Sequence, residues 1–441
     1  MIERLKLMFS QWSHLFGIMK NAGWLTVERV LRLGGAFFIG IWVTVSFEPE
    51  EYAVFAYGLT FVVIARSITG LGLRSIFVRQ YVADPERRLS YAGTSFLLIA
   101  MAGLAGYLLA VIVSLLLGGA ADGSTLIVAI LAGQLLLFPT EVINYVFEAR
   151  LRNKHTVIAR LMGYGVSLGL KIAIVLAGGT IVHLALTYLI DWIVVAVLYL
   201  LAARRQGLNL NSWKWDKEVA RSLLRDSIFL ILSGVMVTLY MQIDQPMLYK
   251  WAGKEESGLY SFAVQLAVAF NFIPIVVQQS VFPNIVASGR RNEQEFLGKM
   301  VKLVRILFYT SIVVCLGVTL FSNLVLHYFP DFKYAGSWPM LKIVIWALPM
   351  VSLGLVQGVY LVSKNLVRYS LYLTTIGAVV NIALNLCLMP LYGGIGAAAA
   401  TVISYSCSGL WAGGFFVATR PYTSLVLRSI FFLKTKPTQP R

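Results

Sequence analysis

The chain has 441 residues, of which 58% are hydrophobic and only 13% are charged, and its formal net charge is +17. Soluble globular domains carry about 25% charged residues, so this composition excludes an ordinary soluble fold and predicts a protein embedded in lipid. A net charge of this size would suggest nucleic acid in a soluble protein. Here the basic residues lie between long apolar runs, so we expect a lipid bilayer and no nucleic acid as partner.

The sequence carries no signature of an enzyme or a metal site. It has no phosphate-binding GxxxxGK[ST] loop and no HExxH motif, and Cys315, Cys387 and Cys407 lie within apolar runs without metal-ligand spacing. No large extracytoplasmic loop is predicted that could hold an active site. We therefore expect no cofactor, no metal and no catalytic residue.

The first predicted element is an amphipathic helix over residues 1–24. Leu5, Trp12 and Met19 recur at helical spacing there, which is typical of a helix that lies on the cytoplasmic interface of a membrane. The alternative is an N-terminal extension of the first membrane span. We expect no cleavable signal peptide.

Twelve membrane spans are predicted after this helix, because a spanning helix needs about 20 mostly apolar residues. They cover residues 25–47, 51–72, 91–118, 124–147, 156–178, 181–202, 223–249, 256–283, 302–328, 337–361, 368–389 and 393–418. The segment 204–222 is a polar linker, and the basic tail 420–441 is too short to span. The sequence thus predicts an all-α polytopic membrane protein.

Charges alternate between the two sides of these spans. Basic residues gather after every second span: Arg74, Arg79, Arg87, Arg88, Arg150, Arg152, Lys154, Arg160, Lys364 and Arg368, with six more between 204 and 225 and five between 290 and 305. The opposite connections are nearly free of basic residues. By the positive-inside rule the basic side is cytoplasmic, so we expect both termini in the cytoplasm of a cell bounded by this inner membrane.

The twelve spans are expected to form two equivalent halves. EPEEYAVFAYGLTF at 48–61 is similar to GKEESGLYSFAVQL at 253–266, and AGGTIVHLALTYLI at 177–190 echoes YGGIGAAAATVISY at 392–405. Parallel repeats of this kind are common in secondary transporters, which bind their substrate between the repeats. We therefore predict an N-terminal six-helix bundle at 25–203, the cytoplasmic linker 204–222 and a C-terminal six-helix bundle at 223–419.

Charged residues inside the predicted spans are concentrated in the first half. They are Glu28, Arg29, Arg32, Arg66, Glu141, Lys171 and Asp191. Each costs about 2.5–3.5 kcal/mol at the centre of a membrane, so these residues must snorkel to the interface, pair with one another or line a wet cavity.

Two interpretations of these charges stay open, and they are compatible. In the first, Glu28 pairs with Arg32, Arg66 with Glu141, and Lys171 with Asp191. In the second, the cations Arg29, Arg32, Arg66 and Lys171 line a cavity that binds a dense anion such as a pyrophosphate, whose oxygens match the arginine fork.

The second half contains one clearly intramembrane acid, Asp244, beside Gln242, Gln245 and Pro246. Low dielectric disfavours an isolated carboxylate, so this group could bind and release a proton. Pro246 and its polar neighbours predict a local break in the helix. Gln278 is a further polar residue, within the next predicted span. The alternative is a hydrogen-bond acceptor that holds spans seven and eight together.

Several stretches resemble one known family. IDQPML at 243–248, GLYSFAVQL at 258–266 and FIPIVVQQSVFPNI at 272–285 look like helices seven and eight of bacterial polysaccharide flippases, a family of the multidrug/oligosaccharidyl-lipid/polysaccharide exporter superfamily. The segments 48–80 and 388–404 are similar to the family's second helix and its eleventh-to-twelfth turn. The resemblance covers nearly the whole chain through degenerate, mostly apolar motifs.

This resemblance implies two six-helix bundles in a V and a bacterial inner-membrane protein that flips an undecaprenyl-pyrophosphate-linked oligosaccharide for O-antigen, lipopolysaccharide or exopolysaccharide synthesis. It also implies alternating access and coupling to protons or sodium, with Asp244 as the candidate coupling acid and a polysaccharide polymerase as a candidate partner. The cavity cations would be Arg29, Arg32, Arg66 and Lys171, with Glu28, Glu141, Asp191 and Gln278 as pairing or cavity-lining polar groups.

Three alternatives remain at this point. A multidrug antiporter fits the twelve spans, but such proteins keep acidic residues in a cation-poor cavity. Peptidoglycan-precursor flippases commonly have fourteen helices, and no thirteenth or fourteenth is evident here. A non-transporting membrane scaffold would leave Lys171 and Asp191 no role beyond pairing.

Overall fold

The computed structural model describes residues 34–35, 37–117, 123–289, 292–328 and 332–433, without the side chains of Pro283 and residues 323–328. The predicted interfacial helix 1–24, most of the first predicted span and the end of the basic tail lie outside these residues.

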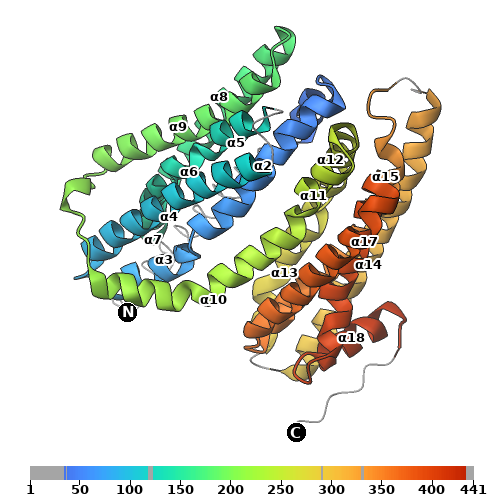
Figure 1. Ribbon diagram of the computed structural model, residues 1–441. Helices are drawn as coiled ribbons and strands as arrows, with labels where there is room; N and C mark the ends of the chain where they lie inside the picture. The colour runs from blue at the N-terminus through green and yellow to red at the C-terminus, as the bar shows by residue number, and fades with distance from the viewer. Residues whose placement is uncertain (1–33, 36, 118–122, 290–291, 329–331, 434–441) are drawn as a thin grey trace, which may run out of the picture. The chain divides into compact units, whose positions relative to one another are not determined.

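The predicted all-helical fold class is confirmed, because every regular element in the described part of the chain is a helix (Figure 1). Ten helical segments there are long and apolar enough to cross a membrane. They correspond to eleven of the twelve predicted spans, since residues 368–414 join the last two. The remaining span, 25–47, lies mostly outside the described residues.

The described helices group into two compact units. Unit 1 comprises the described residues within 1–46 and 61–231, and unit 2 comprises those within 47–60 and 232–441. Helices α2 (Pro49–Thr69) and α10 (Lys217–Gln242) each contribute to both units. The predicted boundaries of two six-helix bundles stay a prediction.

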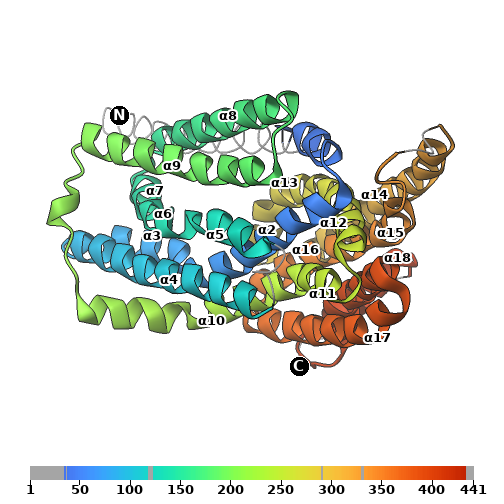
Figure 2. The same ribbon diagram turned by 45° about the horizontal axis from the view of Figure 1, so that its top comes forward.

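Unit 1 is built on long apolar helices around an aromatic core. Its further elements are α3 (Leu73–Ala83), α4 (Arg88–Leu116), α5 (Ser124–Ala132), α6 (Gln134–Leu137), η1 (Phe138–Thr140), α7 (Glu141–Ala149), α8 (Lys154–Leu176), α9 (Ile181–Arg205) and η2 (Leu210–Ser212). Helices α8 and α9 pack side by side along much of their length, as Figures 1 and 2 both show. Phe77, Phe147 and Tyr199 are fully buried in the core.

One span of unit 1 is not a continuous α-helix. Between Ser124 and Ala149 the backbone passes through α5, α6, a 3-10 turn at Phe138–Thr140 and α7. Pro139 within this turn has no N–H to donate to the preceding helical turn, so the regular ladder is interrupted there. Interrupted membrane helices are typical of binding sites in transporters.

The polar linker is shorter than predicted and is attached to α4. Helix α9 continues to Arg205 and α10 begins at Lys217. Both helices therefore extend into the segment 204–222 that the sequence predicts as linker. The Lys214 amide donates to the Leu89 carbonyl at 3.2 Å, and the Asp216 amide donates to the Thr94 hydroxyl at 3.0 Å.

Unit 2 contains α11 (Asp244–Trp251), α12 (Lys254–Ala269), α13 (Phe272–Gly289), α14 (Glu293–Tyr328), α15 (Ser337–Val344), α16 (Ala347–Ser363), α17 (Arg368–Ser406), the π-turn η3 (Cys407–Trp411), η4 (Ala412–Gly414) and α18 (Arg420–Ile430). The predicted break beside Asp244 is confirmed, since α10 ends at Gln242 and α11 begins at Asp244. Pro246 cannot donate to the Gln242 carbonyl, which explains the break.

Helix α17 bends at Gly393, between the last two predicted spans. The residue has φ 53° and ψ −132°, which a side chain would disfavour, and the Glu256 carboxylate accepts a hydrogen bond from the Gly394 amide at 2.9 Å. This bend brings residues on both sides of Gly393 onto Asp244, as described below.

Candidate functional site

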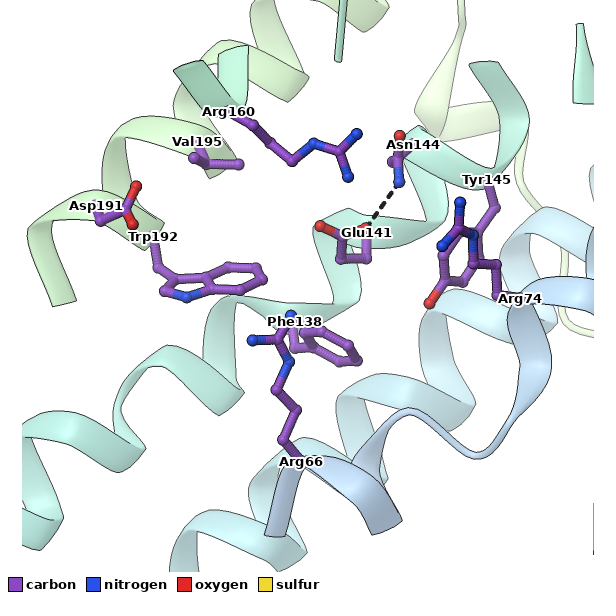
Figure 3. Close-up of a pocket in the computed structure, with 10 residues that line it drawn as sticks. All are labelled: Arg66, Arg74, Phe138, Glu141, Asn144, Tyr145, Arg160, Asp191, Trp192 and Val195. Atoms are coloured by element: carbon purple, nitrogen blue, oxygen red, sulfur yellow. Dashed lines mark hydrogen bonds between the residues drawn. The ribbon is translucent and has the colours of Figure 1, made fainter. Parts of the chain in front are cut away.

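A polar cavity of about 250 Å³ lies within unit 1. Its lining comes from α2, α3, η1, α7, α8 and α9, and Figure 3 shows how these side chains converge. The lining residues are Arg66, Arg74, Phe138, Glu141, Asn144, Tyr145, Arg160, Asp191, Trp192 and Val195. Three guanidinium groups and two carboxylates therefore face one space.

Arg66 enters this cavity between two aromatic rings. Its guanidinium carbon lies 4.7 Å from the Trp192 ring centroid and 5.1 Å from that of Phe138. Stacking on aromatic faces stabilises a cation and fixes the plane of the guanidinium, while the N–H groups at its edge remain able to bind oxygen atoms.

Glu141 occupies the floor of the cavity at the start of α7. The side chain is 8% exposed, and its carboxylate accepts hydrogen bonds from the Asn144 amide at 3.0 Å and the Tyr199 hydroxyl at 3.4 Å. In Figure 3 the guanidinium groups of Arg66 and Arg160 point toward it from opposite sides. The sequence hypothesis that Arg66 and Glu141 come together is thus consistent with their shared cavity.

Arg74 is held at the edge of the lining by a bidentate ion pair. Its Nε and Nη2 donate to the two Glu148 oxygens at 2.9 and 3.1 Å, and the side chain is 57% exposed. Fork-to-carboxylate geometry of this kind orients a guanidinium more strongly than a single contact does.

Asp191 reaches the cavity from α9, at a place where α8 approaches closely. The close approach requires Gly163, because a Cβ there would lie 2.6 Å from Val195 Cγ2 and 2.7 Å from Asp191 Oδ1. Gly163 therefore lets α8 and α9 present Arg160 and Asp191 to the same space.

We expect Gly163→Ala to lower the free energy of unfolding of the purified protein by about 1–3 kcal/mol, the usual cost of overpacking, and therefore to lower its melting temperature. Gly165→Ala is the matched control, since Gly165 lies on the same helix with open space around its Cβ position. Both changes raise helix propensity equally, so equal melting temperatures of the two variants would contradict the close contact at Gly163.

The other charged residues predicted for the first-half site do not appear in the described lining of this cavity. Lys171 is half-buried on α8 outside the described lining, with its ammonium 3.9 Å from the Tyr188 ring centroid. Glu28, Arg29 and Arg32 lie outside the described residues. The roles predicted for these four residues stay predictions.

Arg74, Asn144, Arg160 and Trp192 were missed by the sequence reasoning. Arg74 and Arg160 were counted as topology-setting charges near the ends of spans. The available signal was the position of Arg160, which lies at the start of the predicted span 156–178.

Unit 2 contains a second polar cluster, centred on Asp244. The carboxylate is 5% exposed and accepts three hydrogen bonds: from the Asn385 amide at 2.5 Å, the Thr401 hydroxyl at 2.5 Å and the Tyr260 hydroxyl at 3.0 Å. Asn385 precedes the bend at Gly393 and Thr401 follows it. Within the described part of the chain no Lys or Arg forms an ion pair with Asp244.

A second layer of neutral polar groups supports this cluster. The Asn385 amide also donates to Asn381 Oδ1 at 3.1 Å, and the Asn381 amide donates to the Ser404 hydroxyl at 3.3 Å. Asn385 Oδ1 is buried without a hydrogen-bond partner. Gln278 is half-buried on α13 and is not one of the hydrogen-bond donors to Asp244.

These contacts serve both interpretations of Asp244. The bond from Tyr260 on α12 links the seventh and eighth predicted spans, as the structural interpretation expects. A buried carboxylate held by neutral donors is also the group whose charge a proton or a cation could balance.

The sequence matches the profile of the family described as "Polysaccharide biosynthesis protein" over residues 18–288. The chain belongs to this family. The predicted recognition is confirmed at this level, and the matched region contains both the cavity of unit 1 and Asp244. No curated protein sequence matches the chain.

Solved structures establish the fold of this chain. An inward-facing multidrug resistance MATE family transporter of the MOP superfamily has a TM-score of 0.70 at 17% identity, covering 92% of this chain and 99% of its own. The lipid II flippase MurJ in an inward closed conformation has a TM-score of 0.70 at 15% identity, covering 94% and 91%.

A MOP superfamily transporter from Pyrococcus furiosus, described as having a binding pocket of reverse polarity, has a TM-score of 0.59 at 17% identity and covers 93% and 95%. Together with the ten apolar helical segments, these likenesses show that the chain is a multi-pass membrane protein with a transporter fold. Because pocket polarity varies within the fold, the substrate class has to be argued from the side chains of this chain.

Proposed function

We propose that this protein flips an undecaprenyl-pyrophosphate-linked oligosaccharide, such as an O-antigen or exopolysaccharide repeat unit, from the cytoplasmic to the periplasmic leaflet of a bacterial inner membrane. It does so by alternating access, as a secondary transporter and without a catalytic step. The observation that carries the proposal is the convergence of Arg66, Arg74 and Arg160 on one cavity in a member of the polysaccharide biosynthesis family.

The size and chemistry of the cavity favour the pyrophosphate part of such a substrate. Its volume of about 250 Å³ lies just below the ~300–1,000 Å³ of pockets that enclose drug-sized ligands. A pyrophosphate fits this space, whereas an oligosaccharide needs a larger one. Arginine forks bind phosphate oxygens bidentately, and exclusion of water strengthens the contact.

The carboxylates explain how the cavity tolerates its cations before a substrate binds. Glu141 and Asp191 offset most of the charge of the arginines, which lowers the cost of holding charges in a membrane. An incoming pyrophosphate competes with these carboxylates for the guanidinium groups. Pairing and substrate binding are therefore successive states of the same residues.

Asp244 is our candidate for coupling transport to an ion gradient, with a proton or sodium as the ion. A protonated Asp244 has an O–H to donate, and the partnerless Asn385 Oδ1 could accept it after a turn of the amide. The protonation state of Asp244 would then determine which hydrogen bonds join Asp244 to the parts of α17 before and after Gly393. A polysaccharide polymerase remains a candidate partner.

Deletion of the gene in its native host tests the proposal. We expect an undecaprenyl-linked repeat unit to accumulate, surface polysaccharide to be lost and sensitivity to cationic drugs to stay unchanged. Extraction of lipid-linked sugars, staining of surface polysaccharide and drug-inhibition assays give these results on the same strain. Complementation with the intact gene is the control.

A multidrug antiporter is the second candidate, since MATE transporters share the fold. It predicts the opposite outcome of the deletion: drug sensitivity with normal lipid-linked sugars. A peptidoglycan-precursor flippase would instead give accumulation of lipid II and cell lysis.

A further inference from the structure

Unit 1 contains a second cavity, of about 160 Å³, at the end of the unit where α3 ends and α4 begins. Its lining combines α3, the start of α4, the end of α7 and the linker before α10. The residues are Tyr81, Arg88, Leu89, Ala92, Val146, Arg150, Gly207, Leu208, Asn209, Ser212 and Trp213. Unlike the cavity at Glu141, its described lining contains two arginines and no carboxylate.

The two arginines share one aromatic residue, Tyr81, which is 4% exposed. The Arg88 Nε donates to the Tyr81 carbonyl at 3.0 Å, and the Arg150 Nη2 donates to the Tyr81 hydroxyl at 2.9 Å. Their guanidinium carbons lie 5.3 and 6.0 Å from the ring centroid. Each guanidinium has five N–H groups, so most of its donors remain for another acceptor.

Neighbouring arginines at this end of unit 1 are neutralised. Arg74 pairs with Glu148, Arg79 with Asp226 and Arg87 with Glu218. Within the described residues, Arg88 and Arg150 form no ion pair with a carboxylate. Their positive charge is therefore not offset by a carboxylate of the described residues.

The start of α4 adds to the positive field. The helix is 29 residues long, and the Arg87 side chain forms no cap hydrogen bond. The Asp84 carboxylate accepts from the Arg87 amide at 3.3 Å and leaves the next N–H groups of the first turn for another acceptor. Unpaired N–H groups and the helix dipole at such an end favour an anion. The cavity begins at this end, since Arg88 and Leu89 are part of its lining.

The linker segment that lines part of the cavity packs closely against α4. A Cβ at Gly93 would lie 2.5 Å from both the amide nitrogen and the carbonyl oxygen of Lys214, so only glycine lets the linker lie this close to α4. Trp213 packs edge-on against Phe96 with ring centroids 5.9 Å apart. The site is therefore preformed by bonds that do not involve a ligand.

We propose that this cavity binds a phosphate group through Arg88 and Arg150. The volume suits a small anion and is too small for a drug-sized molecule, for which pockets run to ~300–1,000 Å³. Free phosphate and the headgroup of an anionic phospholipid share this chemistry. The binding does not depend on the proposed transport activity, because none of the lining residues belongs to the cavity at Glu141.

Thermal unfolding of the full-length protein in nanodiscs tests the site. One arm adds inorganic phosphate to phosphatidylcholine discs at constant ionic strength, and the other replaces part of the lipid with phosphatidylglycerol in a phosphate-free buffer. Stabilisation of the wild type by phosphate alone identifies a soluble ligand. Stabilisation by phosphatidylglycerol alone identifies a lipid headgroup.

The double variant R88Q/R150Q should weaken the stabilising ligand at least about tenfold, the effect of losing one charge-assisted hydrogen bond. The double variant R79Q/R87Q removes the same charge from the same end but leaves the cavity intact, so its affinity should stay within about twofold of the wild type. If R88Q/R150Q does not fold, R150Q alone serves, since Arg150 is exposed. No stabilisation in either arm, or equal loss in both double variants, would overturn the site.

Discussion

Replacement of Arg66 by glutamine is expected to reduce polysaccharide export at least about tenfold, the effect of losing one charge-assisted hydrogen bond to a pyrophosphate. Glutamine keeps a planar polar group between Phe138 and Trp192 but removes the charge and the fork. The exposed position of Arg66 predicts little change in protein level. Accumulated lipid-linked repeat units and membrane protein content should be measured in the same strain.

Two controls separate a local role of Arg66 from general loss of charge. Arg79→Gln removes a cation of unit 1 that pairs with Asp226 and does not line the cavity, so export should remain normal. Arg66→Lys keeps the charge but cannot bind two oxygens in a fork, so it should restore export only in part. Wild-type export in Arg66→Gln would refute the pyrophosphate-binding role.

The same cavity shows which parts of the site a sequence can predict. Arg66, Glu141 and Asp191 could be expected together, because each is a charge within an apolar run and its depth can be counted from the end of the run. Trp192 could not be singled out from 56 aromatic side chains. Its role depends on how α9 is rotated, which apolar periodicity alone does not determine.

The Asp244 cluster shows the complementary limit. The acid itself stands out in the sequence, and so does the helix break at Pro246. Its partners Asn385 and Thr401 are neutral residues 141 and 157 positions away. A signal was present, since Asn381 and Asn385 lie one helical turn apart on α17, but a contact across the bend at Gly393 follows only from the fold.

The two halves of the chain share a local backbone feature but carry different polar groups. Gly178 and Gly393 occupy matching places in the repeated segments and have φ of 65° and 53°. The shared scaffold thus carries different polar groups in the two halves: arginines with carboxylates in unit 1, and a carboxylate among neutral donors in unit 2. This difference is compatible with the proposed substrate site in unit 1 and the proposed coupling site in unit 2.

Asp244→Asn is expected to uncouple transport from the ion gradient. In proteoliposomes with an imposed proton or sodium gradient, the wild type should flip a lipid-linked oligosaccharide faster with one of the two gradients than without it. The variant should have the same rate with and without that gradient, because an amide cannot take up a proton and does not attract a cation. The two gradients are imposed separately, so the responding one identifies the coupling ion.

The side chains around residue 244 can accommodate Asp244→Asn with little loss of stability. The asparagine amide occupies the same volume, and its nitrogen can donate to the partnerless Asn385 Oδ1, while its oxygen still accepts from one of the hydroxyl groups of Tyr260 and Thr401. Asp244→Ala would instead remove the acceptor that Asn385, Thr401 and Tyr260 share and leave a cavity in its place, and we expect it to lower stability strongly. The comparison of these two variants therefore separates loss of charge from loss of the network.

Asp226→Asn is the matched control for the coupling role. Asp226 lies on α10 and pairs with Arg79 at 3.3 Å, with 27% of its side chain exposed. Loss of this exposed pair should cost at most about 1 kcal/mol of stability and leave the gradient response intact. If Asp244→Asn responds to the gradient as the wild type does, Asp244 is a structural hydrogen-bond acceptor that joins α12 and α17, and the coupling ion binds elsewhere.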